Sequence, residues 1–358
     1  MMTNFKTYLS FLLITILSLS GCLKDDVSPV FNINLSDNAL LLQYLEQNGD
    51  YINSSNMPSV VNVDEVYNNL NNYLIIDIRT NLQYTNGHIS GAINVSNDSL
   101  IAFLNSNDLS KYLKIVLVSS DGQASSYYTC LLRLYGISNS YSLLWGMAQW
   151  NSAFANIWED NIGDLDDSVK RDFQFGTYIN DSLSNLPNVP LANSATPFEN
   201  KAKRRISDII NAGFVDGDSY IKFDSPDKML FNGEPVSNFY IVCYGIYPFY
   251  FQNTMDPLAV GHFPNAVSFV PEKNLKSTDN LQLLPDKKRI VVYSYSGQES
   301  AFIVAYLRVL GYDAKTLLYG ANKLFYSFMI DKKAAYSPFV FITSDIRNYE
   351  YVTGSSPK

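Results

Sequence analysis

The sequence predicts an α/β protein of two similar domains, each a small parallel β-sheet flanked by helices on both faces. The main observation is a strand, loop and helix pattern that occurs twice, at Ile115–Tyr135 and Ile290–Leu310. In both copies an apolar, β-branched run is typical of a strand buried on both faces, as in parallel sheets. Matching positions lie 175 residues apart: Ser119 and Ser294, Gly122 and Gly297, Gly136 and Gly311. Because the separation is the same in the strand, the loop and the helix end, it indicates a duplicated module.

Each loop has the form of an anion-binding site. The first backbone N–H groups of a helix have no partner within the helix, and they can face an anion held by the preceding loop. A cysteine at the head of such a loop would be favoured as the nucleophilic thiolate. The head is instead a serine in both copies, Ser119 and Ser294. A hydroxyl does not ionise near neutral pH without a partner base, and it cannot carry sulfur as a persulfide.

Motifs around the first loop resemble those of the rhodanese (thiosulfate sulfurtransferase-like) family. Asp77-Ile78-Arg79 and Tyr84 precede Gly87-His88-Ile89-Ser90-Gly91-Ala92-Ile93-Asn94, which is similar to the opening signature of that family. The segment 141–150 resembles its closing Gly-Gly-x-x-x-Trp motif, with Trp145 in place of the first glycine. The resemblance covers residues 60–150. In the second copy, Gly261-His262 and Tyr319-Gly320 correspond to the same two motifs.

The departures from the family pattern predict that both modules are degenerate. An active loop in this family has cysteine at its head and usually arginine at its sixth position, which helps to bind the anionic sulfur donor. Here the sixth positions are Ala124 and Glu299. Glu299 would place negative charge where an anion should bind, which opposes thiolate formation. The second copy also lacks the Asp-x-Arg motif, since Cys243 and Gly245 stand opposite Asp77 and Arg79.

The remaining family-motif residues are expected to support the fold rather than catalysis. In the family that the sequence resembles, the histidine of the Gly-His motif stabilises its turn away from the loop. This structural role is expected for the following residues of the two copies: Asp77, Arg79, Gly87, His88, Gly91, Gly261 and His262.

The pattern of the first 26 residues predicts that the protein is a lipoprotein. Lys6 precedes an apolar stretch, Tyr8–Leu19, that is short for a membrane span and typical of a signal peptide. The stretch ends in Leu19-Ser20-Gly21-Cys22, which resembles the bacterial lipobox. We expect residues 1–21 to be removed and acylated Cys22 to anchor the chain in the lipid bilayer. Lys24-Asp25-Asp26 resembles the surface-export signal of some Bacteroidota lipoproteins. The expected location is the outer membrane, facing the periplasm or the cell surface.

The first domain is expected over residues 39–158, after a membrane tether at 22–38. A helix is expected from Ala39 to Leu45, followed by a strand and short helix at 60–66. Strands at 74–77 and 93–95, a helix at 99–104, the first loop with its helix, and a last strand at 142–144 complete it. The alternation of strands and helices favours a parallel sheet.

The second domain is expected over residues 199–350, between a linker at 159–198 and a flexible tail at 351–358. The helical patterns at 41–49 and 203–211 precede the two modules, so each helix is assigned to the module that follows it. Eight residues are inserted in the second copy, in the aromatic segment 246–257, which forms either a binding surface or a lid packed on the core.

The charge and the cysteine and histidine content of the sequence exclude some classes of partner and cofactor. The net charge is −8 and no basic stripe is present, so no nucleic-acid partner is expected. No cysteine or histidine pair has ligand spacing, so neither a metal nor another cofactor is expected. The sequence favours a catalytically inactive binding or scaffolding module for an unidentified protein or small molecule. Two enzymatic alternatives stay open. One is a sulfurtransferase, of the thiosulfate or mercaptopyruvate type, that works through Cys243. The other is a hydrolase with a Ser119–His88 or Ser294–His262 pair.

Overall fold

The computed structural model describes residues 36–55, 57–170, 173, 183–189, 191, 197–245, 250, 261–331 and 337–355. The predicted signal peptide, Cys22 and nearly all of the tether lie outside these residues, as does most of the aromatic segment 246–257. Within the described residues, no helix has both the length and the apolar character that a membrane span requires.

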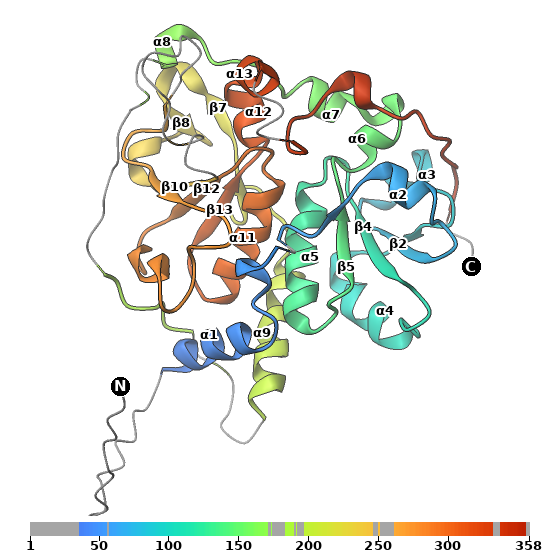
Figure 1. The fold of residues 1–358 in the computed structure, drawn as a ribbon, viewed down its shortest axis with the longest axis horizontal. Coiled ribbons are helices and arrows are strands. Elements are labelled where there is room, and N and C mark those ends of the chain that lie inside the picture. The colour runs from blue at the N-terminus through green and yellow to red at the C-terminus, as the bar shows by residue number, and fades with distance from the viewer. Residues whose placement is uncertain are drawn as a thin grey trace, which may run out of the picture. The chain divides into compact units, whose positions relative to one another are not determined.

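Two five-stranded parallel sheets have the same strand order, which confirms the predicted fold class (Figure 1). The first sheet runs β1-β5-β4-β2-β3 and the second runs β6-β13-β12-β10-β11, so each is ordered first, last, fourth, second and third along its half of the chain. The strands of the first sheet are β1 (Val60–Val61), β2 (Tyr73–Asp77), β3 (Ile93–Asn94), β4 (Lys114–Val118) and β5 (Ser140–Leu143). Those of the second are β6 (Tyr220–Ile221), β10 (Tyr240–Tyr244), β11 (Val267–Phe269), β12 (Ile290–Tyr293) and β13 (Ala314–Leu317).

Helices surround both sheets. Those of the first half are α2 (Val63–Tyr67), α3 (Asn81–Asn86), α4 (Leu100–Ser106), α5 (Gln123–Tyr135), α6 (Met147–Trp150) and α7 (Asn156–Glu159). After α8 (Asp167–Lys170), the second half has α11 (Gln298–Val309), α12 (Gly320–Leu324) and α13 (Tyr326–Asp331). It also has a small antiparallel sheet of β7 (Phe223–Ser225), β8 (Leu230–Phe231) and β9 (Glu234–Pro235).

The two halves share a hydrophobic cluster around helices α5 and α11. Helices α5 and α11, which follow the two loops, pack against each other and are buried almost along their whole length (Figure 1). Their apolar residues belong to a single cluster that also includes residues of β4 and β12. The duplicated modules are therefore joined through their loop helices, and the two loops at the helix starts lie close together.

The helices that precede the modules pack across the two halves. In α1 (Asp37–Gln47), the Asn38 side chain donates hydrogen bonds to the carbonyl oxygens of Pro187 and Leu310. Helix α9 (Phe198–Ala212) packs mainly on α5, and its Ile210 carbonyl accepts a hydrogen bond from Asn97 of the first half. Burial of an amphipathic face requires a partner surface, and that surface belongs here to the other half.

The C-terminal strap, residues 345–354, lies along the first half of the protein. Arg347 forms an ion pair with Asp64 at 2.7 Å, and the Tyr349 N–H donates to the Trp150 carbonyl. Val352 and His88 exchange two backbone hydrogen bonds of 2.9 Å. Residues of the predicted tail thus form backbone hydrogen bonds with the first half.

Candidate functional site

The first loop holds the Ser119 hydroxyl where an anion-binding loop would hold its ligand. Ser119 directly follows β4, and Gly122, with a φ of +86°, turns the chain into α5. The Ser119 Oγ accepts hydrogen bonds from the N–H groups of Gly122 at 3.0 Å and Ser125 at 3.3 Å. It also lies 3.1 Å from the Ser125 Oγ. The hydroxyl oxygen thus occupies the amide cradle that the sequence predicted.

A close backbone approach fixes the shape of this loop. Gly146 follows β5 with a φ of +60°, and the N–H of the next residue, Met147, donates to the Ser119 carbonyl at 3.0 Å. A Cβ atom at Gly146 would lie 2.3 Å from that carbonyl oxygen, so only glycine fits. Gly320 stands in the same relation to Ser294 in the second half, with 2.2 Å for the corresponding distance. The two halves therefore repeat the local construction as well as the topology.

A cavity of about 600 Å³ lies over the first loop and is lined by both halves of the protein. The first half contributes Ser119, Ser120, Asp121 and Ala124 from the loop, and Arg79 and Gln83 from the chain around α3. The second half contributes backbone and side chains of 212–215, together with Tyr220, Lys222, Leu318 and Tyr319. The cavity offers hydroxyl, carboxyl and cationic groups beside aromatic walls, so it suits a small ligand with both polar and apolar parts.

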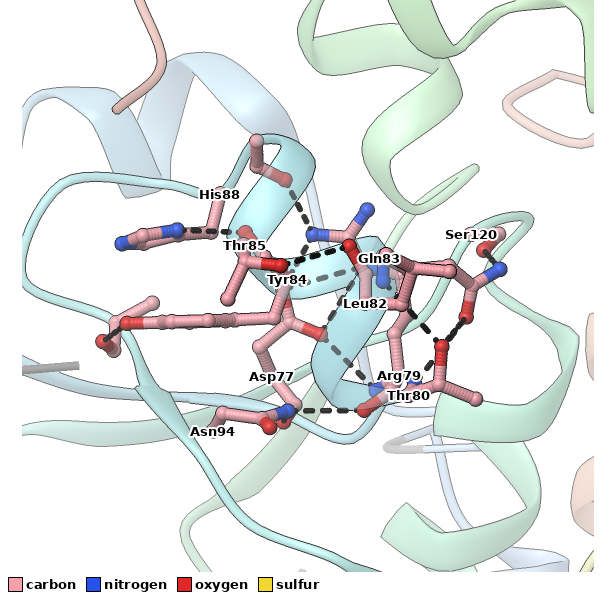
Figure 2. Close-up of polar contacts among 12 residues, drawn as sticks. Asp77, Arg79, Thr80, Leu82, Gln83, Tyr84, Thr85, His88, Asn94 and Ser120 are labelled. Atoms are coloured by element: carbon pink, nitrogen blue, oxygen red, sulfur yellow. Dashed lines mark hydrogen bonds and ion pairs between the residues drawn. The ribbon is translucent and has the colours of Figure 1, made fainter. Parts of the chain in front are cut away.

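Arg79 is held by Asp77 rather than by the cavity. Its guanidinium binds both carboxylate oxygens of Asp77, with a shortest distance of 2.5 Å, and donates to the Gly87 carbonyl at 2.7 Å (Figure 2). Both side chains are almost completely buried. This ion pair ties the end of β2 to the Gly-His turn. Gln83, on helix α3, donates to the Ser120 hydroxyl at 3.4 Å and links the turn to the loop (Figure 2).

His88 packs within the Gly-His turn. Its ring stacks on Tyr84 with centroids 3.6 Å apart, and its Nδ1 lies 2.8 Å from the Tyr84 carbonyl (Figure 2). His262 is similarly stacked on Tyr250 at 3.9 Å, with Nδ1 near the Phe263 carbonyl. In the described part of the chain, no hydrogen bond joins either loop serine to a histidine. The geometry gives no support to a serine–histidine pair.

The glycines of the Gly-His motifs have different roles. A Cβ at Gly87 would lie 2.5 Å from the Phe154 ring, so this glycine allows close packing. Gly91, with a φ of +78°, has open space around it, and Gly261 has a φ of +68°. The positive φ favours glycine at both positions.

The second loop is filled by a side chain of its own. The Ser294 Oγ accepts from the N–H groups of Gly297 at 3.2 Å and Ser300 at 3.1 Å, which repeats the first cradle. It donates to the Glu299 carboxyl at 3.0 Å, and the same carboxyl oxygen accepts from the Ser296 hydroxyl at 2.6 Å. Burial raises the pKa of Glu299. The acidic group thus lies at the head of the loop, where an anionic ligand would have to bind.

Two glutamines connect the loops reciprocally, and sequence reasoning missed both. Gln298 donates to the Gly122 carbonyl at 3.1 Å and accepts from the Trp145 N–H at 3.0 Å. Gln123 accepts from the Tyr319 N–H at 2.8 Å and donates to Asp121 at 2.9 Å. Both side chains are fully buried. The available signal was a glutamine directly after the loop glycine in each copy, 175 residues apart.

Asp121 is the acidic group of the first loop. Its carboxyl accepts from the Gln123 backbone N–H and from the Gln123 side chain, both at 2.9 Å. Burial raises its pKa, while those two bonds and the Ser119 hydroxyl act in the opposite direction. The loop therefore carries an acid beside its serine and no basic side chain at the sixth position, which is Ala124.

The cysteines are poorly placed to react. Cys130 and Cys243 are free thiols with no exposed surface. Burial raises the pKa of Cys243 to about 12, so almost none of it is thiolate near neutral pH. Among the described residues, no group of three or more histidine, cysteine, aspartate or glutamate side chains could hold a metal ion.

Comparison with known proteins places the similarity in the first half. The model of the rhodanese-like domain matches residues 62–153. Thiosulfate sulfurtransferase GlpE of Shewanella oneidensis is 34% identical over 82 residues, which are 23% of this chain and 78% of that protein. GlpE of Pseudomonas paraeruginosa is 34% identical over 80 residues, 22% of this chain and 71% of that protein.

Two solved structures are similar at low sequence identity. A rhodanese-related protein from Thermoplasma volcanium is 22% identical and aligns with 25% of this chain and 88% of its own, with a TM-score of 0.23. A thiosulfate sulfurtransferase from Pseudomonas aeruginosa is 13% identical and aligns with 79% of this chain and 47% of its own, with a TM-score of 0.28.

Proposed function

Because the chain belongs to the rhodanese-like family, we propose that it is a non-catalytic member of that family that binds a small molecule or a protein segment through the cavity over its first loop. The proposal includes a second rhodanese-like module in the repeated half. It also includes anchoring of the whole chain in the bacterial outer membrane through acylated Cys22.

The observation that carries the proposal is the position of Ser119. Its oxygen lies in the amide cradle, where sulfur transfer requires a sulfur atom that can be charged as a persulfide. Ala124 stands where an active member of the family has the loop arginine, and the nearby Arg79 is already bound to Asp77. The first loop keeps the shape of the family site without the groups that perform sulfur transfer.

Hydrolysis by Ser119 is the weaker alternative. A serine nucleophile needs a base to take its proton and a third group to orient that base. Asp121 is the acidic group nearest in the chain. Its oxygens already accept two hydrogen bonds from Gln123, and these stabilise the carboxylate and weaken it as a base. The two serines, Ser119 and Ser125, bond to each other and to backbone groups.

Turnover assays test the inactive state. The full chain, incubated with thiosulfate or mercaptopyruvate and cyanide, is expected to form no thiocyanate above background, while GlpE of Shewanella oneidensis serves as the active control. A fluorophosphonate probe is expected to label neither Ser119 nor Ser294. Thiocyanate formation or labelling that disappears in Ser119→Ala would refute the proposal.

Ligand binding is tested by filling the cavity. Ala124 lines it, whereas Ala102 is exposed on α4, away from the loop. Capture of a small molecule or protein from the cell's own envelope is expected with the native chain and with Ala102→Phe, and it should be lost with Ala124→Phe. Equal capture by both variants would show that the cavity is not the binding site.

Anchoring is tested separately. Globomycin, which blocks lipoprotein signal cleavage, should cause the precursor to accumulate. Cys22→Ser should abolish acylation and release the chain from the membrane fraction. Normal processing under globomycin would contradict the lipoprotein assignment and leave the cavity proposal intact.

A further inference from the structure

A second, smaller cavity lies next to the cavity over the first loop. It has a volume of about 150 Å³ and is lined by Asn161, Lys222, Phe223, Leu318, Tyr319 and Lys323. Three of these residues, Lys222, Leu318 and Tyr319, also line the larger cavity. The two spaces are therefore neighbours that share a wall, and we name the smaller one the lysine pocket.

The described residues that line the lysine pocket include two lysines and no carboxylate. The Lys323 ammonium donates to the Asn161 side-chain oxygen at 3.1 Å, and in the described part of the chain it takes part in no ion pair. Lys222 pairs with Asp216 at 2.6 Å, with about half of each side chain exposed. Burial lowers the pKa of Lys323, the Lys222 charge lowers it further, and Asp224 raises it. A partly buried cation without a carboxylate partner favours an anion at this place.

The repeated fold gives an internal comparison for this pocket. Lys222 directly follows β6 and Lys323 lies three residues after Gly320. The same positions of the first half, directly after β1 and three residues after Gly146, are Asn62 and Gln149. These two line a cavity of about 490 Å³ together with Leu144 and Trp145, the counterparts of Leu318 and Tyr319. The cavity is thus a feature of both halves, and only the second copy lines it with two cations.

We propose that the lysine pocket binds a small oxyanion, namely a carboxylate, sulfate or phosphate group, between the ammonium groups of Lys222 and Lys323. Ammonium groups form charge-assisted hydrogen bonds with such oxygens, and the amide of Asn161 supplies a further polar contact. Tyr319, Phe223 and Leu318 also line the pocket, and their apolar groups reduce the screening of these charges by water. This site does not depend on a ligand in the larger cavity, so the two proposals can fail independently.

Calorimetry with inorganic phosphate and sulfate tests the proposal on the full chain in detergent, with sodium chloride at equal ionic strength as the reference. One site is expected per chain. Its affinity should fall at least tenfold in Lys323→Gln, which installs the residue found at the equivalent first-half position, and also in Lys222→Gln. Lys323→Arg should retain binding because it retains the charge. Lys228→Gln removes an exposed lysine outside the pocket and should change nothing.

Methyl-labelled lysine signals in NMR give a readout that a merely structural role would not affect. The titration of Lys323 should move to higher pH when phosphate is present, because a bound anion stabilises the ammonium form. Binding should persist in Ala124→Phe, which fills the larger cavity. The proposal is overturned if phosphate and sulfate bind no better than chloride. It is also overturned if Lys323→Gln and Lys228→Gln behave alike, or if Ala124→Phe abolishes binding.

Discussion

Cysteines placed at the heads of the two loops should have thiol pKa values shifted in opposite directions, lower at position 119 and higher at position 294. In Ser119→Cys the thiolate would receive hydrogen bonds from the N–H groups of Gly122 and Ser125, which now lie 3.0 and 3.3 Å from the serine oxygen. Hydrogen bonds to a charged group contribute about 1.5–3 kcal/mol each, and the start of α5 adds about 0.3–1 kcal/mol. Burial and the Asp121 carboxyl oppose this gain. A net stabilisation of about 3 kcal/mol would lower the thiol pKa by about two units.

Ser294→Cys is the matched control, since it has the same backbone cradle but a carboxyl group 3.0 Å from the head atom. Two negative charges at that distance repel by about 5 kcal/mol at an effective dielectric constant of about 20. The pair can therefore hold one charge near neutral pH, and Glu299, as the stronger acid, should hold it. The pKa of the thiol at position 294 should be raised.

The measurement is thiolate absorbance against pH, with the native chain subtracted. The subtraction removes the background from Cys130 and Cys243, whose pKa values are raised by burial. The reasoning about the two loops is wrong if both introduced cysteines titrate at the same pH. Sulfur transfer from thiosulfate should appear in Ser119→Cys only weakly, and it should increase when Ala124→Arg supplies the missing guanidinium.

Five further substitutions test the packing and the charge of the loops and of the Gly-His turn. Gly146→Ala should destabilise the protein by at least about 3 kcal/mol in urea unfolding, because a Cβ would lie 2.3 Å from a carbonyl oxygen. Gly91→Ala is the control and should cost only about 1 kcal/mol, because the space around Gly91 is open. Gln298→Ala should cost about 1–3 kcal/mol, because it leaves the Trp145 N–H without an acceptor. The same change at Gln123 should cost a similar amount, because it removes the acceptor of the Tyr319 N–H. The pKa of Glu299 is raised in the folded protein, so its contribution to the unfolding free energy is fully present below the usual value of 4.5 and is lost as pH rises through the folded pKa. Glu299→Gln should remove this loss. A difference in unfolding free energy between the native chain and Glu299→Gln that stays constant from acid to neutral pH would contradict this reasoning.

The local pattern of the sequence predicted the strands, the loops and the repeated fold, because burial on both faces leaves a clear apolar signature. It could not predict where α1 and α9 pack, since amphipathic periodicity identifies a buried face but not its partner. It also could not predict that Gln123 and Gln298 enter the opposite loop. A glutamine at a helix start has the pattern of a solvated residue, and its burial depends on how the two halves meet. The strap at 345–354 is rich in polar residues and lacks periodicity, so a tail was the natural prediction.

The two loops differ in a way that assigns different tasks to the two halves. Glu299 places a carboxyl group of the same chain beside the head of the second loop, so an external anion would have to displace a buried side chain that accepts three hydrogen bonds. In the first loop the sixth residue, Ala124, has no such carboxyl group, and a cavity of about 600 Å³ stands over the loop. Its far wall is built by Tyr220, Lys222 and Tyr319 of the second half. The second half therefore acts as a wall of the first site. A ligand that binds there contacts both halves, whereas neither half alone forms the complete cavity.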